Sequence, residues 1–153
     1  MIFTDEAALL TLNDISIGNL ALGFGYGHRG MPFLISEEEG AKGLFRLRGE
    51  FCTIQDDYRT RLLSLGTPAV RFDAESAIPD DKAPDDGTLM FTSDGPGIFE
   101  NSHHIRAFGG SLTLLSGTKK NFRRGHDTPA FAKWDIGYMR EQEFVRIATI
   151  DAH

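Results

Sequence analysis

The chain has 153 residues and a mass of 16.9 kDa, which is the size of one domain. Its composition is that of a globular protein, with 41% hydrophobic and 25% charged residues, and its 17 glycines indicate many turns. The net charge of −6 disfavours general binding to nucleic acid or to an anionic membrane.

The cysteine content and the first residues bear on the cellular compartment. Cys52 is the single cysteine, which excludes an intramolecular disulfide. Asp5 and Glu6 stand where a secretory signal would carry basic residues before an apolar run. No apolar stretch reaches the length that spans a bilayer. We therefore expect a cytoplasmic protein, although a precursor whose leader had been removed would have the same sequence.

The first quarter of the chain predicts a short helix and an interrupted strand. Thr4–Leu12 has the capping residue and composition of a short helix. Ile15–Tyr26 predicts a strand with a β-bulge at Gly18–Asn19, because the apolar residues change parity there. The other face of this strand, over Gly23–Gly27, consists mainly of glycine. A face without side chains leaves room for a ligand or another backbone to approach.

The middle of the chain predicts one long strand and one helix. Leu44–Ile54 alternates, with Phe45 and Phe51 on one face and charged residues on the other. Asp56–Leu65 has apolar residues at helical spacing, and Gly66 suits the position after a helix end. This segment is the best helix of the sequence.

The second half predicts a series of short strands separated by turns. Ala77–Gly87 holds two prolines and four aspartates, which is typical of an exposed loop. Turn chemistry occurs at Asp94–Gly97 and again at Gly109–Gly110. The expected strands are Ala69–Asp73, Thr88–Thr92, Ile98–Asn101 with its continuation His103–Phe108, Ser111–Leu115, Phe131–Met139 and Glu143–Asp151, the last pairing with Phe131–Met139. The prediction is a single domain over 1–153, an antiparallel β-barrel or sandwich of about eight strands with one helix.

A glycine-rich segment suggests a ligand site but not a dinucleotide site. Gly25–Gly30 matches G-x-G-x-x-G, yet Pro32 and an extended apolar run follow where the pyrophosphate-binding helix should begin. The turn still presents His28 and Arg29 to a ligand, and an exposed hairpin end is the simpler interpretation. We assign ligand binding to four residues: His28, Arg29, Tyr26 and Trp134.

The histidines give little support for a metal. His103 and His104 are adjacent, so on a strand they point to opposite faces, whereas strand metal sites use H-x-H. A composite site of His104, His126, Asp127 and Glu100 is the alternative. We expect neither a bound metal nor a cofactor.

The strand through Glu100 carries the candidate catalytic residues. Glu100, His104 and Arg106 share one parity, so a carboxylate, an imidazole and a guanidinium would follow one another along one face. Facing inward, they suit acid–base chemistry on a small substrate. The alternation equally fits a polar face in solvent, which is the commoner arrangement of half-buried strands.

Two charged segments suggest partners. Asp73–Asp86 holds six carboxylates and one lysine, and Lys119–Arg124 holds four cations and no acid. The first hypothesis is a small-molecule-binding β-barrel with an anionic ligand, acting as a cofactor-independent isomerase, cyclase or lyase. The alternative is a non-catalytic interaction module (an immunity, inhibitor, regulatory or phage-encoded protein) whose Asp73–Asp86 loop binds a basic partner. Pairing of edge strands into a homodimer is left open.

Overall fold

The computed structural model of the chain describes residues 10–24, 30–47, 50–53, 61–101, 109–125 and 127–152. Strands account for most of these residues, which confirms the prediction of a mainly β protein. The helical segments among them are two short 3-10 turns, Leu12–Asp14 and Ala74–Ser76.

The described strands form three antiparallel sheets. Sheet 1 has the order β4-β3-β2-β1-β5, sheet 2 the order β10-β9-β8-β7-β11, and sheet 3 the order β13-β12-β6. Sheet 1 comprises β1 (Leu20–Phe24), β2 (Pro32–Glu38), β3 (Ala41–Arg46), β4 (Glu50–Thr53) and β5 (Arg61–Gly66). Sheet 2 comprises β7 (Leu89–Thr92), β8 (Gly95–Asn101), β9 (Gly109–Leu114), β10 (Lys119–Arg123) and β11 (Ala130–Phe131). Sheet 3 comprises β6 (Ala69–Phe72), β12 (Lys133–Arg140) and β13 (Glu143–Asp151).

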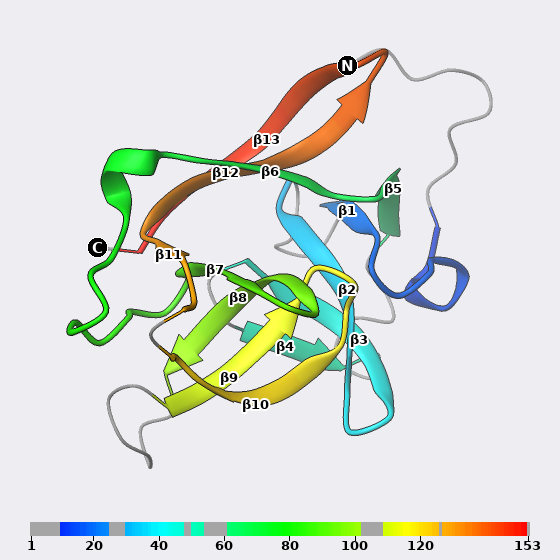
Figure 1. Ribbon diagram of the computed structural model, residues 1–153. Helices are drawn as coiled ribbons and strands as arrows, with labels where there is room; N and C mark the ends of the chain where they lie inside the picture. Colours follow the sequence, from blue (N-terminus) through cyan, green and yellow to red (C-terminus); the bar gives the residue numbers. More distant parts are fainter. Residues whose placement is uncertain are drawn as a thin grey trace.

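The sheets meet edge to edge as well as face to face. Figure 1 shows β2 running beside β10, where Glu37 and Thr118 form a parallel bridge. The β12–β13 hairpin extends away from the other two sheets (Figure 1). The strands that the structure describes close into no barrel, and they are more numerous than the eight that the sequence predicted.

One central core collects side chains from all three sheets. Its members are buried, and they are Leu20, Leu34, Phe45 and Leu47 from the sheet 1 region, Leu89, Ile98 and Leu115 from the sheet 2 region, and Trp134, Ile136 and Ile150 from sheet 3. Strand alternation sends the intervening residues to the opposite faces. There Phe33, Ile35, Leu44 and Leu62 form a second cluster on sheet 1, and Met90, Phe99, Leu112 and Leu114 form a third on sheet 2. Most strands of sheets 1 and 2 are therefore covered on both faces.

The predicted helix over Asp56–Leu65 is wrong for its described part, because Arg61–Gly66 is strand β5. β5 pairs with β1, and Leu62 lies in the cluster on the outer face of sheet 1 while Leu65 packs against the central core. Leu62 and Leu65 are three residues apart, which is also the spacing of residues on one face of a helix, although here they lie on opposite faces of a sheet. Gly66 does have a positive φ of 77°, so the glycine signal marked the end of this element, which is a strand.

Near the N-terminus two further predictions need correction. Leu10, which belongs to the predicted helix Thr4–Leu12, forms an antiparallel bridge with Leu62; residues 4–9 lie outside the described residues. The predicted strand from Ile15 begins only at Leu20. The expected bulge at Gly18–Asn19 is a turn, and the irregularity in strand pairing falls between Leu20 and Ala21. Gly18 has a φ of 93°, which explains the change of parity.

The predicted strand Leu44–Ile54 is a hairpin of β3 and β4. In the register of the two strands, Phe45 is paired opposite Phe51. Most of the later strand predictions are confirmed, including the pairing of Glu143–Asp151 with the strand before it. Ala77–Gly87 is a loop with mostly exposed residues. Gly109–Gly110, predicted as a turn, belongs to β9.

Candidate functional site

A group of polar residues lies on the core-facing side of sheet 2. Ile98 of β8 is fully buried in the central core, and Glu100 follows two residues later on the same face. On the neighbouring strand β9, Ser111 is opposite Glu100 and Thr113 is opposite Ile98. Directly paired residues of antiparallel strands point to the same side. The inner face therefore changes from apolar to polar at this end of β8.

Strand β10 adds a cation to this face and joins it to sheet 1. Lys119 is paired with Thr113, so its side chain is on the same side. The Lys119 Nζ lies 2.5 Å from Oε1 of Glu38 on β2. Both side chains are about 30% exposed, at 27% and 31%, so this ion pair reaches solvent. It bridges the two sheets next to the parallel contact of β2 with the segment before β10.

Strand β2 contributes a buried hydroxyl. Leu34 belongs to the central core, and Ser36 and Glu38 follow it on the same face. Ser36 is 2% exposed and is paired with Gly43, which has no side chain to cover it. We call the set Ser36, Glu38, Glu100, Thr113 and Lys119 the polar island.

Two hydroxyls of the polar island are buried without hydrogen-bond partners among the described residues. Ser36 Oγ and Thr113 Oγ1 have no contact with water, and the two residues are 2% and 1% exposed. A buried polar group left unpaired costs about 1–3 kcal/mol, so native proteins pair most of them with protein, water or ligand. These two hydroxyls are therefore the polar atoms of the polar island whose hydrogen bonds the described residues leave unmade.

Glu100 has a strongly perturbed pKa. The pKa is raised from 4.5 to about 7, and burial is the largest cause; Lys119 lowers the pKa, and the negative charges of Asp86 and Glu38 raise it. Asp86 is brought near because the next residue, Gly87, donates its N–H to the carbonyl of Phe99 at 2.8 Å. Burial of a carboxyl disfavours its charged form, and two neighbouring carboxylates act in the same direction. Glu100 can therefore both hold and release a proton near neutral pH.

A glycine sets the strand spacing at Glu100. A Cβ on Gly110 would overlap the Glu100 carbonyl oxygen and also contact the ring of Phe99. Only a glycine allows the two backbones to approach this closely. Gly110 therefore maintains the packing of β9 against the strand that carries Glu100.

Glu100 is the one predicted catalytic residue that the structure describes. Of the two interpretations of its strand, the inward one fits this position better, because Ile98 on the same face lies in the central core and Phe99 on the other face is also fully buried. His104 and Arg106 lie outside the described residues, as do Tyr26, His28 and Arg29.

Trp134, the remaining predicted ligand contact, is part of the central core. It is 1% exposed, and its Nε1–H donates to the carbonyl of Gly87 at 2.8 Å. The ring fills the core and the N–H is used by the fold, which is the usual arrangement for a buried tryptophan.

The basic segment Lys119–Arg124 is largely taken up by contacts within the chain. Besides the Lys119 pair, Lys120 Nζ lies 2.6 Å from Asp94 Oδ2. The Arg124 side chain is 2% exposed. Its Nη2 donates to the Ile78 carbonyl at 2.5 Å and its Nη1 to the Pro79 carbonyl at 2.8 Å.

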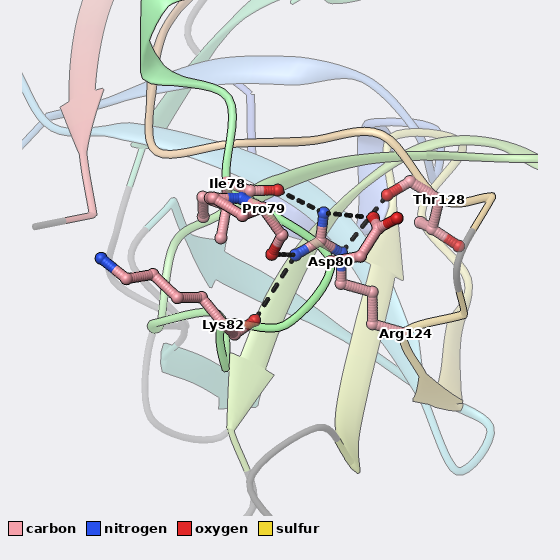
Figure 2. Close-up of polar contacts among 6 residues, drawn as sticks. All are labelled: Ile78, Pro79, Asp80, Lys82, Arg124 and Thr128. Carbon is pink, nitrogen blue, oxygen red and sulfur yellow. Dashed lines mark hydrogen bonds and ion pairs between the residues drawn. The ribbon is translucent and has the colours of Figure 1, made fainter.

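Arg124 thereby anchors the loop of residues 77–87 to the segment after β10. Figure 2 shows the guanidinium among loop carbonyls, with longer contacts to Lys82, Thr128 and the Asp80 carboxylate. Five donors in a planar fork suit a residue that must satisfy several carbonyls at once. For Arg124, one of the four cations of this segment, the structure therefore shows a role in holding the fold together.

The described residues contain no group of three or more histidine, cysteine or acidic side chains placed to hold a metal ion. No helix among them has the length and apolar character needed to cross a lipid bilayer. Comparison with protein families, with curated proteins and with solved structures finds no match for this chain.

Sequence reasoning did not assign Ser36, Glu38, Thr113 or Lys119 to a site with Glu100. One signal was available, because Ser36 shares the parity of the core residue Leu34 in an otherwise apolar run. The partners of these residues come from strands far apart in the chain, so no local pattern brings them together.

Proposed function

We propose that this protein binds a small polar molecule at the polar island and exchanges a proton with it through Glu100. The observation that carries the proposal is the pair of buried hydroxyls of Ser36 and Thr113, beside a partly buried carboxyl and an ion pair that reaches solvent. Such an arrangement of few convergent polar groups next to an apolar core is typical of ligand sites.

The donors and acceptors of the polar island define the ligand class. Each hydroxyl can donate once and accept, and the Lys119 ammonium has donors beyond the one that Glu38 occupies. The described members carry two carboxylates and one ammonium, with Asp86 adding a further negative charge. This balance favours a small neutral molecule with hydroxyl or carbonyl groups. The anionic ligand of the sequence hypothesis depends on Arg29 and Arg106, which lie outside the described residues.

The proposed chemistry is proton transfer without a cofactor. A carboxyl whose pKa is near the working pH is an efficient general acid or base. Lys119 would hold negative charge that develops on a ligand oxygen, which is how isomerases and lyases stabilise enolate-like intermediates. Glu100 would be the acid–base residue, and Ser36 and Thr113 would orient the ligand.

Filling the polar island with apolar groups tests the proposal. The double variant Ser36→Ala, Thr113→Val keeps the packing but removes both hydroxyls, and Ser93→Ala with Thr67→Val is the control pair on exposed surface. Saturation-transfer NMR with small polyols and hydroxyketones should detect binding to the wild type and to the control pair. Binding to the double variant should fall at least about tenfold, since each lost hydrogen bond is worth about 1 kcal/mol.

Stability measured on the same variants distinguishes a site from a structural cluster. Because the hydroxyls have no hydrogen-bond partner among the residues that the structure describes, removing them should leave the free energy of unfolding unchanged or raise it by about 1 kcal/mol. Loss of binding together with unchanged or increased stability supports the proposal. Undiminished binding, or a loss of stability of several kcal/mol, contradicts it.

A further inference from the structure

A second surface, independent of the polar island, lies at the foot of the acidic loop, by which we mean Asp73–Asp86. The structure has a solvent-open groove of about 280 Å³ here. Its walls are mainly apolar, and the exposed Asp80 and Asp127 stand beside them. The apolar lining includes Ala77, Ile78, Pro129 and Phe131.

An aromatic stack continues the groove onto the surface. The ring of Phe131 is stacked on that of Phe72 with centroids 4.1 Å apart, and Phe91 meets Phe131 edge-on at 5.9 Å. Phe72 is 44% exposed, which is unusual for so large an apolar side chain. Exposed aromatic residues beside a concave apolar surface are typical of sites that bind another molecule.

The charge around the groove is negative. The acidic loop carries six carboxylates and one lysine, and Asp127 adds another carboxylate. The cation within the groove wall, Arg124, has a side chain that is 2% exposed and is surrounded by loop carbonyls (Figure 2). An incoming group therefore meets the carboxylates and the aromatic face rather than this guanidinium.

We propose that this groove docks a basic segment of a partner protein, with an arginine or lysine side chain lying against Phe131 and its charged head near Asp80 and Asp127. A cation over an aromatic ring and between carboxylates gains from both contacts. The negative charge of the loop disfavours nucleic acid. It also disfavours a second copy of this chain, whose net charge is −6 and whose cations Lys119, Lys120 and Arg124 are held in internal contacts.

The proposal is tested with a capped peptide of sequence Ala-Arg-Ala-Arg-Ala, titrated into the isotope-labelled full chain and followed by amide NMR. Shifts should concentrate at residues 77–80 and 127–131. The same peptide with citrulline in place of arginine keeps the shape without the charge, and it should bind at least about tenfold more weakly because charged hydrogen bonds are the stronger kind.

Single-charge variants locate the interaction. Asp127→Asn should weaken arginine-peptide binding about fivefold, which is the upper range for an exposed charge pair. The control Glu143→Gln removes one charge from the exposed start of β13 and should leave binding unchanged. Asp80→Asn is the second variant, checked by its amide spectrum because Asp80 also contacts Arg124.

Several outcomes would overturn the proposal. Equal binding of the citrulline peptide, or of a leucine analogue, would mean that charge does not select the occupant. Equal loss of binding in Glu143→Gln would show a general electrostatic effect. A dimer in light scattering that Phe72→Ser dissociates would assign the surface to a second copy of the chain.

Discussion

Replacing Glu100 by glutamine keeps the shape of the side chain and removes its titration. In the wild type the fold raises the pKa of this carboxyl from 4.5 to about 7, mainly by burial. Between these two pH values the unfolded chain has released the proton while the folded chain still holds it. The folded state therefore binds more protons, and the free energy of unfolding falls as the pH rises through this window.

The size of the effect follows from the pKa shift. Each pH unit of a fully developed shift is worth about 1.36 kcal/mol, which would give about 3 kcal/mol across the window. Glu100 is partly exposed, and solvent screening reduces this to about 1–2 kcal/mol. Relative to the wild type, Glu100→Gln should gain that amount of stability between pH 4.5 and pH 8.

Urea denaturation at a series of pH values measures this difference. At each pH the quantity of interest is the urea midpoint of Glu100→Gln minus that of the wild type. Between pH 4.5 and pH 8 this difference should increase by about 0.5–1 M, which corresponds to a gain of 1–2 kcal/mol. Glu143→Gln, on an exposed residue of β13, is the matched control and should follow the wild type at every pH. Identical pH dependence of wild type and Glu100→Gln would refute the account of Glu100 as a carboxyl with a raised pKa.

Three further predictions concern the supports of the fold. Gly110→Ala should cost about 2–3 kcal/mol in thermal or urea unfolding, because the new methyl group overlaps the Glu100 carbonyl oxygen. Gly125→Ala, where nothing lies within 4 Å of the added Cβ, should be nearly neutral. Arg124→Lys replaces a fork of donors by one ammonium, so it should destabilise the protein by about 2–4 kcal/mol and expose the acidic loop to limited proteolysis; an unchanged cleavage rate would contradict the anchoring role. For Asp135, burial raises the pKa, but hydrogen bonds from Thr149 and Arg71 and the charges of Arg71 and Arg146 outweigh it and lower the pKa overall. Asp135→Asn should therefore be less stable than the wild type at pH 7, with the difference disappearing as the pH falls below about 4; a difference that persists in acid would mean that packing is the cause.

The sequence by itself determined the class of fold and many of the strands. Alternating apolar residues and turn glycines depend on local geometry, so they located β7, β13 and the loop at Ala77–Gly87. The same alternation predicted one strand over Leu44–Ile54, where the structure has the two paired strands β3 and β4.

Local pattern failed where two faces of a sheet are both covered. Leu62 and Leu65 resemble one face of a helix in the sequence, yet they serve opposite faces of sheet 1. The spacing of apolar residues indicates which residues are buried. It does not indicate which other elements they pack against. Arg124 shows the same limit, since a cation in a basic run looks solvated until the loop that surrounds it is known.

The candidate site was decided by tertiary structure. The sequence identified Glu100 as a candidate acid–base residue, but its pKa depends on burial and on charges from other strands. Ser36 and Glu38 come from β2, and Thr113 and Lys119 come from β9 and β10; these strands are brought together where β2 lies beside β10. Electrostatic and hydrogen-bonding environments are properties of neighbours in space, and here those neighbours are separated by up to about 80 residues of chain.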